Sequence, residues 1–237
     1  IQPPELSKIA LPDDVGIIYD ATQTLGLIAG GVLSNPLETQ ENMIMIGGTH
    51  KTFPGVTCGY IATNHHEYIE KVTQNISPNY LRNVQVNNIT SVCLSMIELL
   101  RFGEEYAQNI IRTANELGQA LESKGIRVKR VSPDQFTCTH QLFIEIESAR
   151  VDEAYRNFRK YGITLNKRNT PYAVGFRLGV QEVARYHFDN HIDELAELIR
   201  MVLQEPEQEK KILSLKAELS KLKTDRYIMD DIFMEWD

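Results

Sequence analysis

The sequence predicts an α/β protein in which part of a mostly parallel sheet is followed by a smaller α+β domain. Three observations support this: continuous apolar runs before residue 65, helical periodicity from residue 84, and short strands that alternate with helices after residue 125. The chain has 237 residues, of which 42% are hydrophobic, which is enough for one large domain or two modest ones. We place the domains at residues 1–100 and 101–204, with a helical and acidic tail at 205–237.

Three short apolar runs in the first domain predict buried strands. The first covers residues 15–19 and is followed by Asp20, and the second covers residues 42–46 and leads into a Gly-Gly-Thr-His-Lys segment at 47–51. A third run covers residues 58–63. Continuous apolar runs are typical of strands that are covered on both faces. Polar side chains just beyond the ends of such strands are where an open α/β sheet binds its ligands.

Helices and further short strands are predicted for the rest of the chain. Helical patterns cover residues 84–100 and 104–124, with Gly125 as the C-terminal stop. Beyond it we expect strands at 126–131, 140–147, 163–166 and 175–179, and helices at 152–161 and 189–204. Apolar residues at roughly heptad spacing in 206–223 indicate a helix that packs on a partner or on its own domain. The acidic segment 230–237 would be a docking tail or a flexible end.

Composition narrows the class of protein. The formal net charge of −7 and the absence of basic runs argue against nucleic acid and membrane surfaces as partners, and no apolar stretch is long enough to span a membrane. The three cysteines are far apart in sequence, which fits reduced thiols in a cytoplasmic protein. We interpret His65-His66 as a surface pair at a helix start, and no metal site is expected. The chain begins at Ile1 without an initiator Met or a signal peptide, so we expect it to be one piece of something larger or to lack upstream residues.

Three charged residues are candidates for chemistry. Lys51 follows a buried strand, where a lowered pKa would make its amine a nucleophile, although most lysines are surface residues. Asp20 ends another buried strand and needs a partner, either a cation such as a protonated pyridine nitrogen or a structural salt bridge or helix cap. The guanidinium of Arg177, in the segment Gly-Phe-Arg-Leu-Gly, suits bidentate capture of an amino-acid carboxylate, with a surface ion pair as the alternative. Arg185 is a weaker candidate for the same role.

Five segments of the chain match, in the same order, five motifs of one known enzyme family. Residues 20–31 resemble the motif Asp-x-Ala-His-x-x-Gly-Leu-Ile-Ala-x-Gly, and residues 49–52 resemble the end of Thr-Thr-Thr-Thr-His-Lys-Thr. Residues 137–140 are similar to Thr-Asp-x-His, residues 162–167 to Gly-Ile-x-x-Asn-Lys, and residues 175–179 to Gly-x-Arg-x-Gly. The family is serine hydroxymethyltransferase, and the chain resembles its C-terminal half or so. The resemblance implies part of the large domain of a fold type I pyridoxal-phosphate enzyme, followed by the small α+β domain.

The resemblance implies a role for each matching residue. Lys51 would hold pyridoxal phosphate as an internal aldimine, a Schiff base, and Asp20 would pair with the pyridine nitrogen. Thr49 and His50 would line the cofactor and orient the lysine, with His50 counted as catalytic. Arg177 would bind the substrate carboxylate. The implied enzyme is a transferase or aldolase of amino-acid metabolism that makes or breaks a bond at Cα of a small amino acid such as glycine, serine or threonine, by aldol, transaldol or hydroxymethyl transfer.

The chain also departs from the family pattern. Gln23, still expected at the cofactor, replaces the histidine that follows Asp-x-Ala, and residues 54–59 replace the family's Arg-Gly-Pro-Arg-Gly-Gly, so that both arginines are lost. The link from Asn166 to Arg177 is shorter than usual, and in the family that loop helps to form the folate pocket. These departures argue against folate-dependent transfer, and a folate-free aldolase or transaldolase is at least an equal alternative.

The family's upstream half, with its cradle for the cofactor phosphate and its dimer-swapped residues, has no counterpart in this sequence. We therefore expect a second polypeptide to carry the N-terminal half, in a split enzyme that works as a hetero-oligomer and as a dimer of such units. Two alternatives stay open: a transaminase or another fold type I reaction, and a catalytically degenerate partner subunit. The joint presence of Asp20, Lys51 and Arg177 argues against a degenerate subunit.

Overall fold

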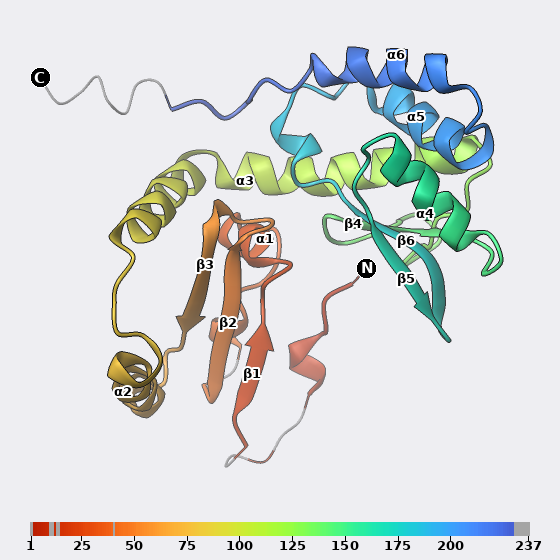
Figure 1. The fold of residues 1–237 in the computed structure, drawn as a ribbon. Helices are drawn as coiled ribbons and strands as arrows, with labels where there is room; N and C mark the ends of the chain where they lie inside the picture. Colours follow the sequence, from red (N-terminus) through yellow and green to blue (C-terminus); the bar gives the residue numbers. More distant parts are fainter. Residues whose placement is uncertain (1, 10–11, 13–14, 40, 230–237) are drawn as a thin grey trace, which may run out of the picture. The chain divides into compact units, whose positions relative to one another are not determined.

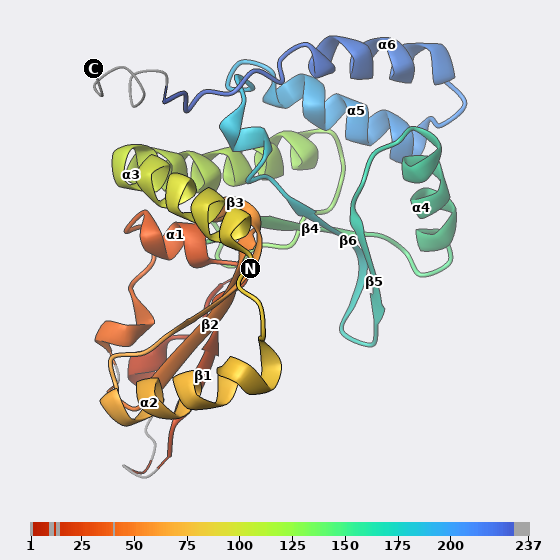
Figure 2. The ribbon, with the colours of Figure 1, turned by 60° about the vertical axis from the view of Figure 1, so that its left-hand side comes forward.

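The computed structural model describes the chain except for residues 1, 10–11, 13–14, 40 and 230–237, and it forms two compact units (Figures 1 and 2). The first unit is Pro4–Gln108, and the second is Asn109–Asp237 together with the first three residues. The boundary falls inside a long helix, α3 (Val86–Ser123). The predicted acidic tail at 230–237 lies outside the described residues.

The first unit is built on a three-stranded sheet with the order β1-β2-β3. β1 (Ile17–Asp20) runs parallel to β2 (Met43–His50), with a register from Ile17 opposite Met43 to Asp20 opposite Ile46. β3 (Pro54–Ala62) is antiparallel to β2. Only residues 51–53 join β2 to β3, and a parallel pair would need a crossover of a dozen residues or so. The apolar runs located these strands, but β2 and β3 are longer than the runs predicted. The prediction of buried strands is wrong for β1 and β3, which alternate between half-buried and exposed positions or carry several exposed ones.

Short helices accompany this sheet. The α-helices of the first unit before α3 are α1 (Leu25–Ala29) and α2 (His66–Asn75), and the shorter turns are η1 (Leu6–Lys8), η2 (Pro36–Glu38) and η3 (Ile76–Tyr80). α2 begins at His66, in agreement with the interpretation of the histidine pair as a helix start. α1 ends at Gly30, where a Cβ would lie 2.3 Å from the carbonyl oxygen of Gly103 and 2.5 Å from Cβ of Ala107. Gly30 thus lets α1 pack closely on α3.

The helix α3 is continuous over 38 residues, whereas the sequence pattern predicted two helical blocks separated near residue 102. The interruption in the pattern falls at Gly103, which contacts Gly30 and stays helical. Gly125 has a φ of +75°, the left-handed conformation that ends a helix, as predicted. No helix of the described residues, α3 included, is both long enough and apolar enough to cross a membrane.

The second unit contains an antiparallel sheet with the order β4-β6-β5. Its strands are β4 (Gln141–Glu145), β5 (Asn166–Thr170) and β6 (Ala173–Gly179), and its helices are α4 (Val151–Lys160), η4 (Val183–Arg185), α5 (Ile192–Gln204) and α6 (Glu209–Ser220). The predicted strand at 126–131 is wrong, because only Val128 forms a bridge, to Ile144. The strand predicted at 163–166 lies instead at 166–170, and its side chains are all exposed, so no apolar pattern marks it.

The core of the second unit is formed by one sheet face and by buried apolar residues of α3, α4 and α5. Phe176 of β6 packs edge-on against Phe158 of α4, with ring centroids 5.4 Å apart. α6 packs on α5 and buries Ile212 and Leu219. Of the two readings of the heptad-like segment, the structure therefore supports a helix that packs on its own domain.

Candidate active site

Asp20 and Lys51 lie at the same edge of the first-unit sheet. Asp20 is the last residue of β1, and Lys51 directly follows the last residue of β2. Because the two strands are parallel, their carboxyl ends meet at one edge, where α/β proteins place their ligand sites. The charge of Lys51 contributes to lowering the pKa of Asp20, although the two side chains form no ion pair within 4.0 Å. The structure thus brings together two residues that the sequence analysis selected independently.

Asp20 is held in its ionised form mainly by Thr22. The backbone N–H of Thr22 donates to Oδ1 of Asp20 at 2.9 Å. Hydrogen bonds from the side chain and the backbone of Thr22 are the largest causes of the lowered pKa of Asp20; the positive charge of Lys51 adds to them, and partial burial opposes them. A carboxylate prepared in this way is suited to pair with a cation.

Lys51 is half-buried, and its amine has no partner among the described residues. Among the residues that the structure describes, its Nζ makes no hydrogen bond and no ion pair within 4.0 Å. A primary amine and an ionised carboxylate at one sheet edge are the two groups that a pyridoxal ring requires, one for its aldehyde carbon and one for its ring nitrogen. The side chains present at this edge therefore fit such a cofactor.

A buried threonine fixes the lysine segment to the aspartate segment. Oγ1 of Thr52 donates to the carbonyl oxygen of Gln23 at 3.1 Å and accepts from the N–H of Gly26, also at 3.1 Å. A Cβ on Gly26 would lie 2.1 Å from the backbone oxygen of Thr52, so only glycine allows this approach. Sequence reasoning missed this role of Thr52; the available signal was a threonine directly after the candidate lysine.

The other predicted cofactor residues surround the same edge. The hydroxyl of Thr49 donates to the carbonyl oxygens of Val56 at 2.5 Å and of Cys58 at 3.3 Å, so it holds the β2–β3 hairpin together. The side chain of His50 is exposed, and its ring lies so close to Gly48 that a Cβ there would be 2.9 Å from Cε1. Gln23, half-buried, offers its backbone oxygen to Thr52. A cofactor role for these three residues stays a prediction.

Arg177 belongs to the second unit, in the central strand β6. Burial, and after it the charge of Arg168, lowers the pKa of Arg177. The rival candidate Arg185 is engaged in structural contacts, because it pairs with Asp225 at 3.3 Å and lies 5.9 Å from the ring centroid of Tyr227. The structure therefore favours Arg177 as the arginine available to a ligand.

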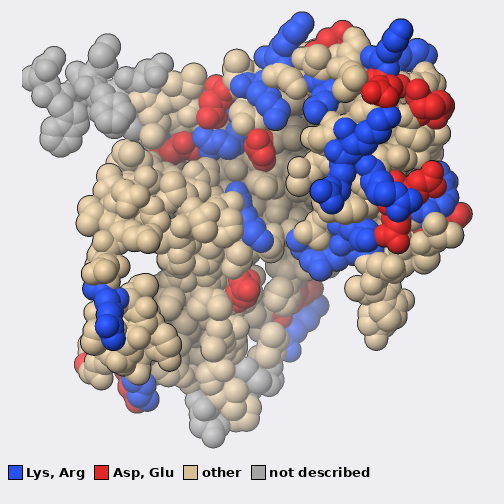
Figure 3. Space-filling model, viewed as in Figure 1, with Lys and Arg blue, Asp and Glu red and all other residues tan. Residues whose placement is uncertain are grey.

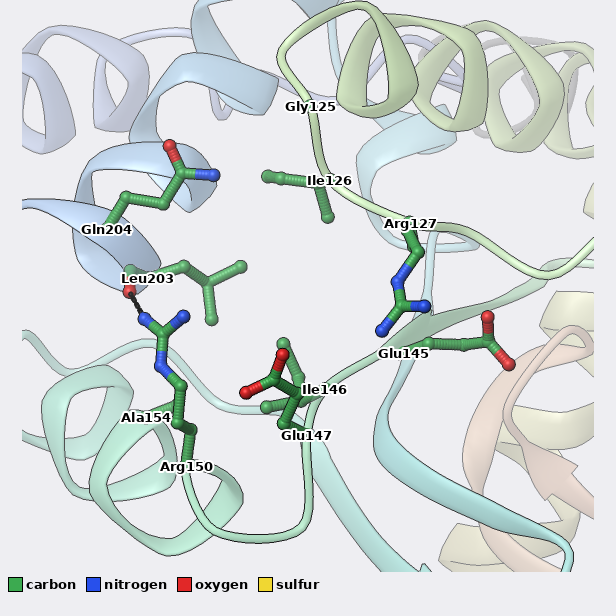
Figure 4. A pocket seen from close by; sticks show the side chains of 10 residues that line it. All are labelled: Gly125, Ile126, Arg127, Glu145, Ile146, Glu147, Arg150, Ala154, Leu203 and Gln204. Carbon is green, nitrogen blue, oxygen red and sulfur yellow. Dashed lines mark hydrogen bonds between the residues drawn. The ribbon is translucent and has the colours of Figure 1, made fainter.

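Two cavities among the described residues, one in each unit, contain none of the predicted site residues. In the second unit a cavity of about 220 Å³ lies between β4, α4 and the end of α5 (Figure 4). Arg127, Glu147 and Arg150 line it, and Arg150 donates to the carbonyl oxygen of Leu203 at 3.4 Å. In the first unit a groove of about 490 Å³ is lined mainly by α1 and the segment after it, together with Met45 and Tyr60.

Comparisons with known proteins agree with this arrangement. Residues 5–199 match the family model described as serine hydroxymethyltransferase. The chain is 33% identical over 231 residues to serine hydroxymethyltransferase of Archaeoglobus fulgidus, covering 92% of this chain and 51% of that protein. It is also 33% identical over 224 residues to the enzyme of the same description from Pyrococcus abyssi, covering 88% and 52%.

A solved structure is similar over the same extent. The crystal structure of L-threonine transaldolase from Pseudomonas fluorescens in its internal aldimine state superposes with a TM-score of 0.82 at 25% sequence identity. The match covers 94% of this chain and 54% of that one. The chain thus spans about half the length of the relatives that it matches.

Proposed function

The chain belongs to the serine hydroxymethyltransferase family and has the fold of a fold type I pyridoxal-phosphate enzyme, and on this basis we propose that it supplies the reactive lysine and the ring-pairing acid of such an enzyme. The reaction would make or break a bond at Cα of a small amino acid. The observation that carries the proposal is that Lys51, whose amine has no partner among the described residues, and Asp20, whose pKa is lowered, lie at the ends of two neighbouring parallel strands.

The proposed roles follow from the chemistry of each side chain. Pyridoxal phosphate, when bound, supplies an electron sink for the charge that develops at the substrate Cα. Asp20, kept ionised by Thr22, would hold a proton on the ring nitrogen. Lys51 would hold the cofactor through its Nζ, and this amine would be placed to move a proton at the substrate. Arg177 would bind the substrate carboxylate through two parallel N–H bonds.

Within this class we propose an aldol or transaldol reaction that does not use folate. The β5–β6 hairpin supports this choice, because residues 171–172 alone join its strands and leave no long loop between Asn166 and Arg177. The similarity to L-threonine transaldolase favours it as well, since that protein has the same fold over nearly the whole chain. Gln23 stands in place of the family's histidine, and this is a further difference from the family pattern, at the edge where the cofactor would lie.

The test is the release of aldehyde from β-hydroxy amino acids by the assembled protein, with and without folate. We expect acetaldehyde from threonine, no stimulation by folate, and complete loss of product in Lys51→Ala. Lys71→Ala is the matched control, since Lys71 pairs with Glu67 on the surface of α2 in the same unit. Borohydride reduction followed by peptide mass spectrometry should find the pyridoxyl group on Lys51. A keto acid without aldehyde would point to a transaminase, and modification of another lysine would overturn the assignment.

We propose further that a second polypeptide, related to the half of the relatives that this chain does not span, completes the fold. The free edge of β1 supports this, because among the described residues β1 pairs only with β2. Parallel strands are normally buried on both faces, yet Ile18 of β1 is 70% exposed. An unpaired apolar strand edge is a template for another strand.

The first half of α3 offers a second docking surface to the same partner. Its exposed residues Val86, Ile89, Cys93, Met96 and Leu100 are spaced by three and four positions, which is the pattern of a helix that packs lengthwise on another helix. Leu100 is 88% exposed, and residues 86–97 contain no charged side chain. Figure 3 shows the corresponding uncharged surface over this part of α3.

Co-expression with the candidate partner and light scattering of the purified complex test this second proposal. We expect a hetero-oligomer that contains two copies of each chain, and we expect Leu100→Glu to prevent its formation. Leu213→Glu is the control, because Leu213 is also an exposed helical leucine but lies on α6 of the second unit. Assembly that tolerates Leu100→Glu as well as Leu213→Glu would contradict the α3 surface.

A further inference from the structure

Two arginines share one face of the second-unit sheet. Asn166 of β5 is paired with Arg177 of β6, and Arg168 lies two positions further along β5. Residues paired across antiparallel strands point to the same face, as do residues two positions apart. Arg168 is therefore the diagonal neighbour of Arg177, with the Cα atoms of the two residues about 7–8 Å apart.

The third basic residue of this hairpin lies on the opposite face and is neutralised there. Lys167 is paired with Phe176, whose ring packs on α4. Its Nζ contacts Oδ1 of Asp152 at 2.6 Å and lies 5.3 Å from the ring centroid of Tyr155. Lys167 thus has a carboxylate partner, whereas the two arginines on the other face have none among the described residues.

No acidic side chain of the described residues offsets Arg168 and Arg177. Neither makes an ion pair or a hydrogen bond through its side chain within the described part of the chain. Glu145 is on the same face but contacts Lys129 at 3.9 Å, and Gly175 lies between Glu145 and Arg168 in the sheet. Burial, and after it the charge of Arg168, lowers the pKa of Arg177, which means that its charged form is less stable here than in water. A bound anion would stabilise the charged form of both arginines.

One position of this face, next to Arg168, carries no side chain. A Cβ on Gly175 would lie 1.9 Å from the carbonyl oxygen of Ile144, so the position excludes any side chain. Gly175 thus places no side chain between Arg168 and Glu145.

We propose that Arg168 and Arg177 together bind a small ligand with two anionic groups, so that a substrate with a second carboxylate or a phosphate besides its amino-acid carboxylate binds more tightly than a monocarboxylate such as threonine. This rests on the proposed function, in which Arg177 takes the amino-acid carboxylate; Arg168 takes the second group. Two guanidinium groups on neighbouring strands match the spacing of the two ends of a short dianion.

The test is protection of individual arginines from phenylglyoxal, read by peptide mass spectrometry on the full chain in its assembled form. Acetate, malonate and inorganic phosphate are compared at constant ionic strength. We expect malonate or phosphate to slow the modification of Arg168 and Arg177 in parallel, at a concentration about tenfold lower than acetate requires. Arg130, which is paired with Glu122, is the internal control and should not respond. The relative effects of malonate and phosphate distinguish a dicarboxylate from a phosphorylated substrate.

Variants separate this inference from the proposed reaction. Arg168→Gln should abolish the advantage of the dianions over acetate at Arg177, whereas Lys167→Gln, on the other face, should preserve it. Equal protection by acetate and dianions, or a preference that survives Arg168→Gln, would overturn the inference. Lys51→Ala should leave the protection intact, so a failure of the proposed chemistry would not be mistaken for a failure of this site.

Discussion

At the scale of single residues, the site depends on threonines that the sequence analysis did not select. Asp20 and Lys51 could be predicted because each comes at the end of an apolar run. The hydrogen bonds of Thr52 join positions 26 and 29 residues away in sequence. Such partners depend on how β1 and β2 align in space, which no local pattern encodes. Arg177 could be predicted from its place in the segment Gly-Phe-Arg-Leu-Gly, but the importance of its neighbour Arg168 depends on strand register.

We expect Thr52→Val to destabilise the first unit, because it leaves the N–H of Gly26 and the carbonyl oxygen of Gln23 buried without their partner. The loss should be about 1–3 kcal/mol in the free energy of unfolding. Urea denaturation measures it. Thr52→Ser keeps the hydroxyl and should recover most of the loss. Equal stability of Thr52→Val and the wild type would show that the two bonds are dispensable.

The pKa of Asp20 gives a prediction about pH. Because its folded-state pKa lies below the ordinary value of 3.8, ionised Asp20 stabilises the fold fully above pH 3.8, and this contribution is lost as the pH falls through the lower folded-state pKa. Thr22→Val removes the side-chain bond and should move the pKa of Asp20 back toward 3.8. A carboxyl carbon NMR titration checks this. Asp152, whose pKa is lowered by Lys167, serves as the unaffected reference in the same spectra.

At the scale of elements, periodicity predicted most helices and strands and failed where tertiary contacts decide. The pattern broke α3 near Gly103, yet the helix continues because Gly103 and Gly30 approach each other closely. β5 was misplaced because its side chains are all exposed, so the strand forms through pairing with β6 and not through burial of its own residues. β3 is antiparallel because its connection to β2 is short, a feature that apolar runs do not report.

Gly30→Ala should test the contact between α1 and α3. The added Cβ would meet the carbonyl oxygen of Gly103 at 2.3 Å, so the helices must move apart. We expect a loss of about 1–3 kcal/mol, as for other overpacked sites. Gly59→Ala is the matched control, because a Cβ at Gly59 has no neighbour within 4 Å. The midpoints of thermal unfolding of both variants test this prediction. Equal midpoints would mean that the close contact between Gly30 and Gly103 does not contribute to stability.

At the scale of the whole molecule, the sequence predicted two successive domains and placed their boundary near residue 100. The two compact units meet at residues 108 and 109, inside a continuous helix that gives no break in composition to mark the boundary. The need for a partner was inferred from a resemblance. The exposed Ile18 and the apolar first half of α3 are the surfaces of this chain on which we expect the partner to bind.

Hydrogen exchange tests this surface on the assembled protein. On binding of the partner we expect new protection of backbone amides in β1, through pairing at its free edge, and in the first half of α3, through exclusion of water. The β4-β6-β5 sheet, in which β6 is paired on both sides, should change little. Protection confined to the second unit would contradict the proposed docking surface.

The short β2–β3 connection has a consequence for the order of folding. A hairpin closed by residues 51–53 joins neighbours along the chain and is expected to form within about 1–10 μs. β1 pairs with β2 across a separation of 26 positions, from Ile17 to Met43, and must pay a larger loop-closure entropy. φ-values should therefore be higher for truncations in the hairpin than for truncations in β1. The strand that leads to Lys51 would then be the template on which the strand ending in Asp20 later assembles.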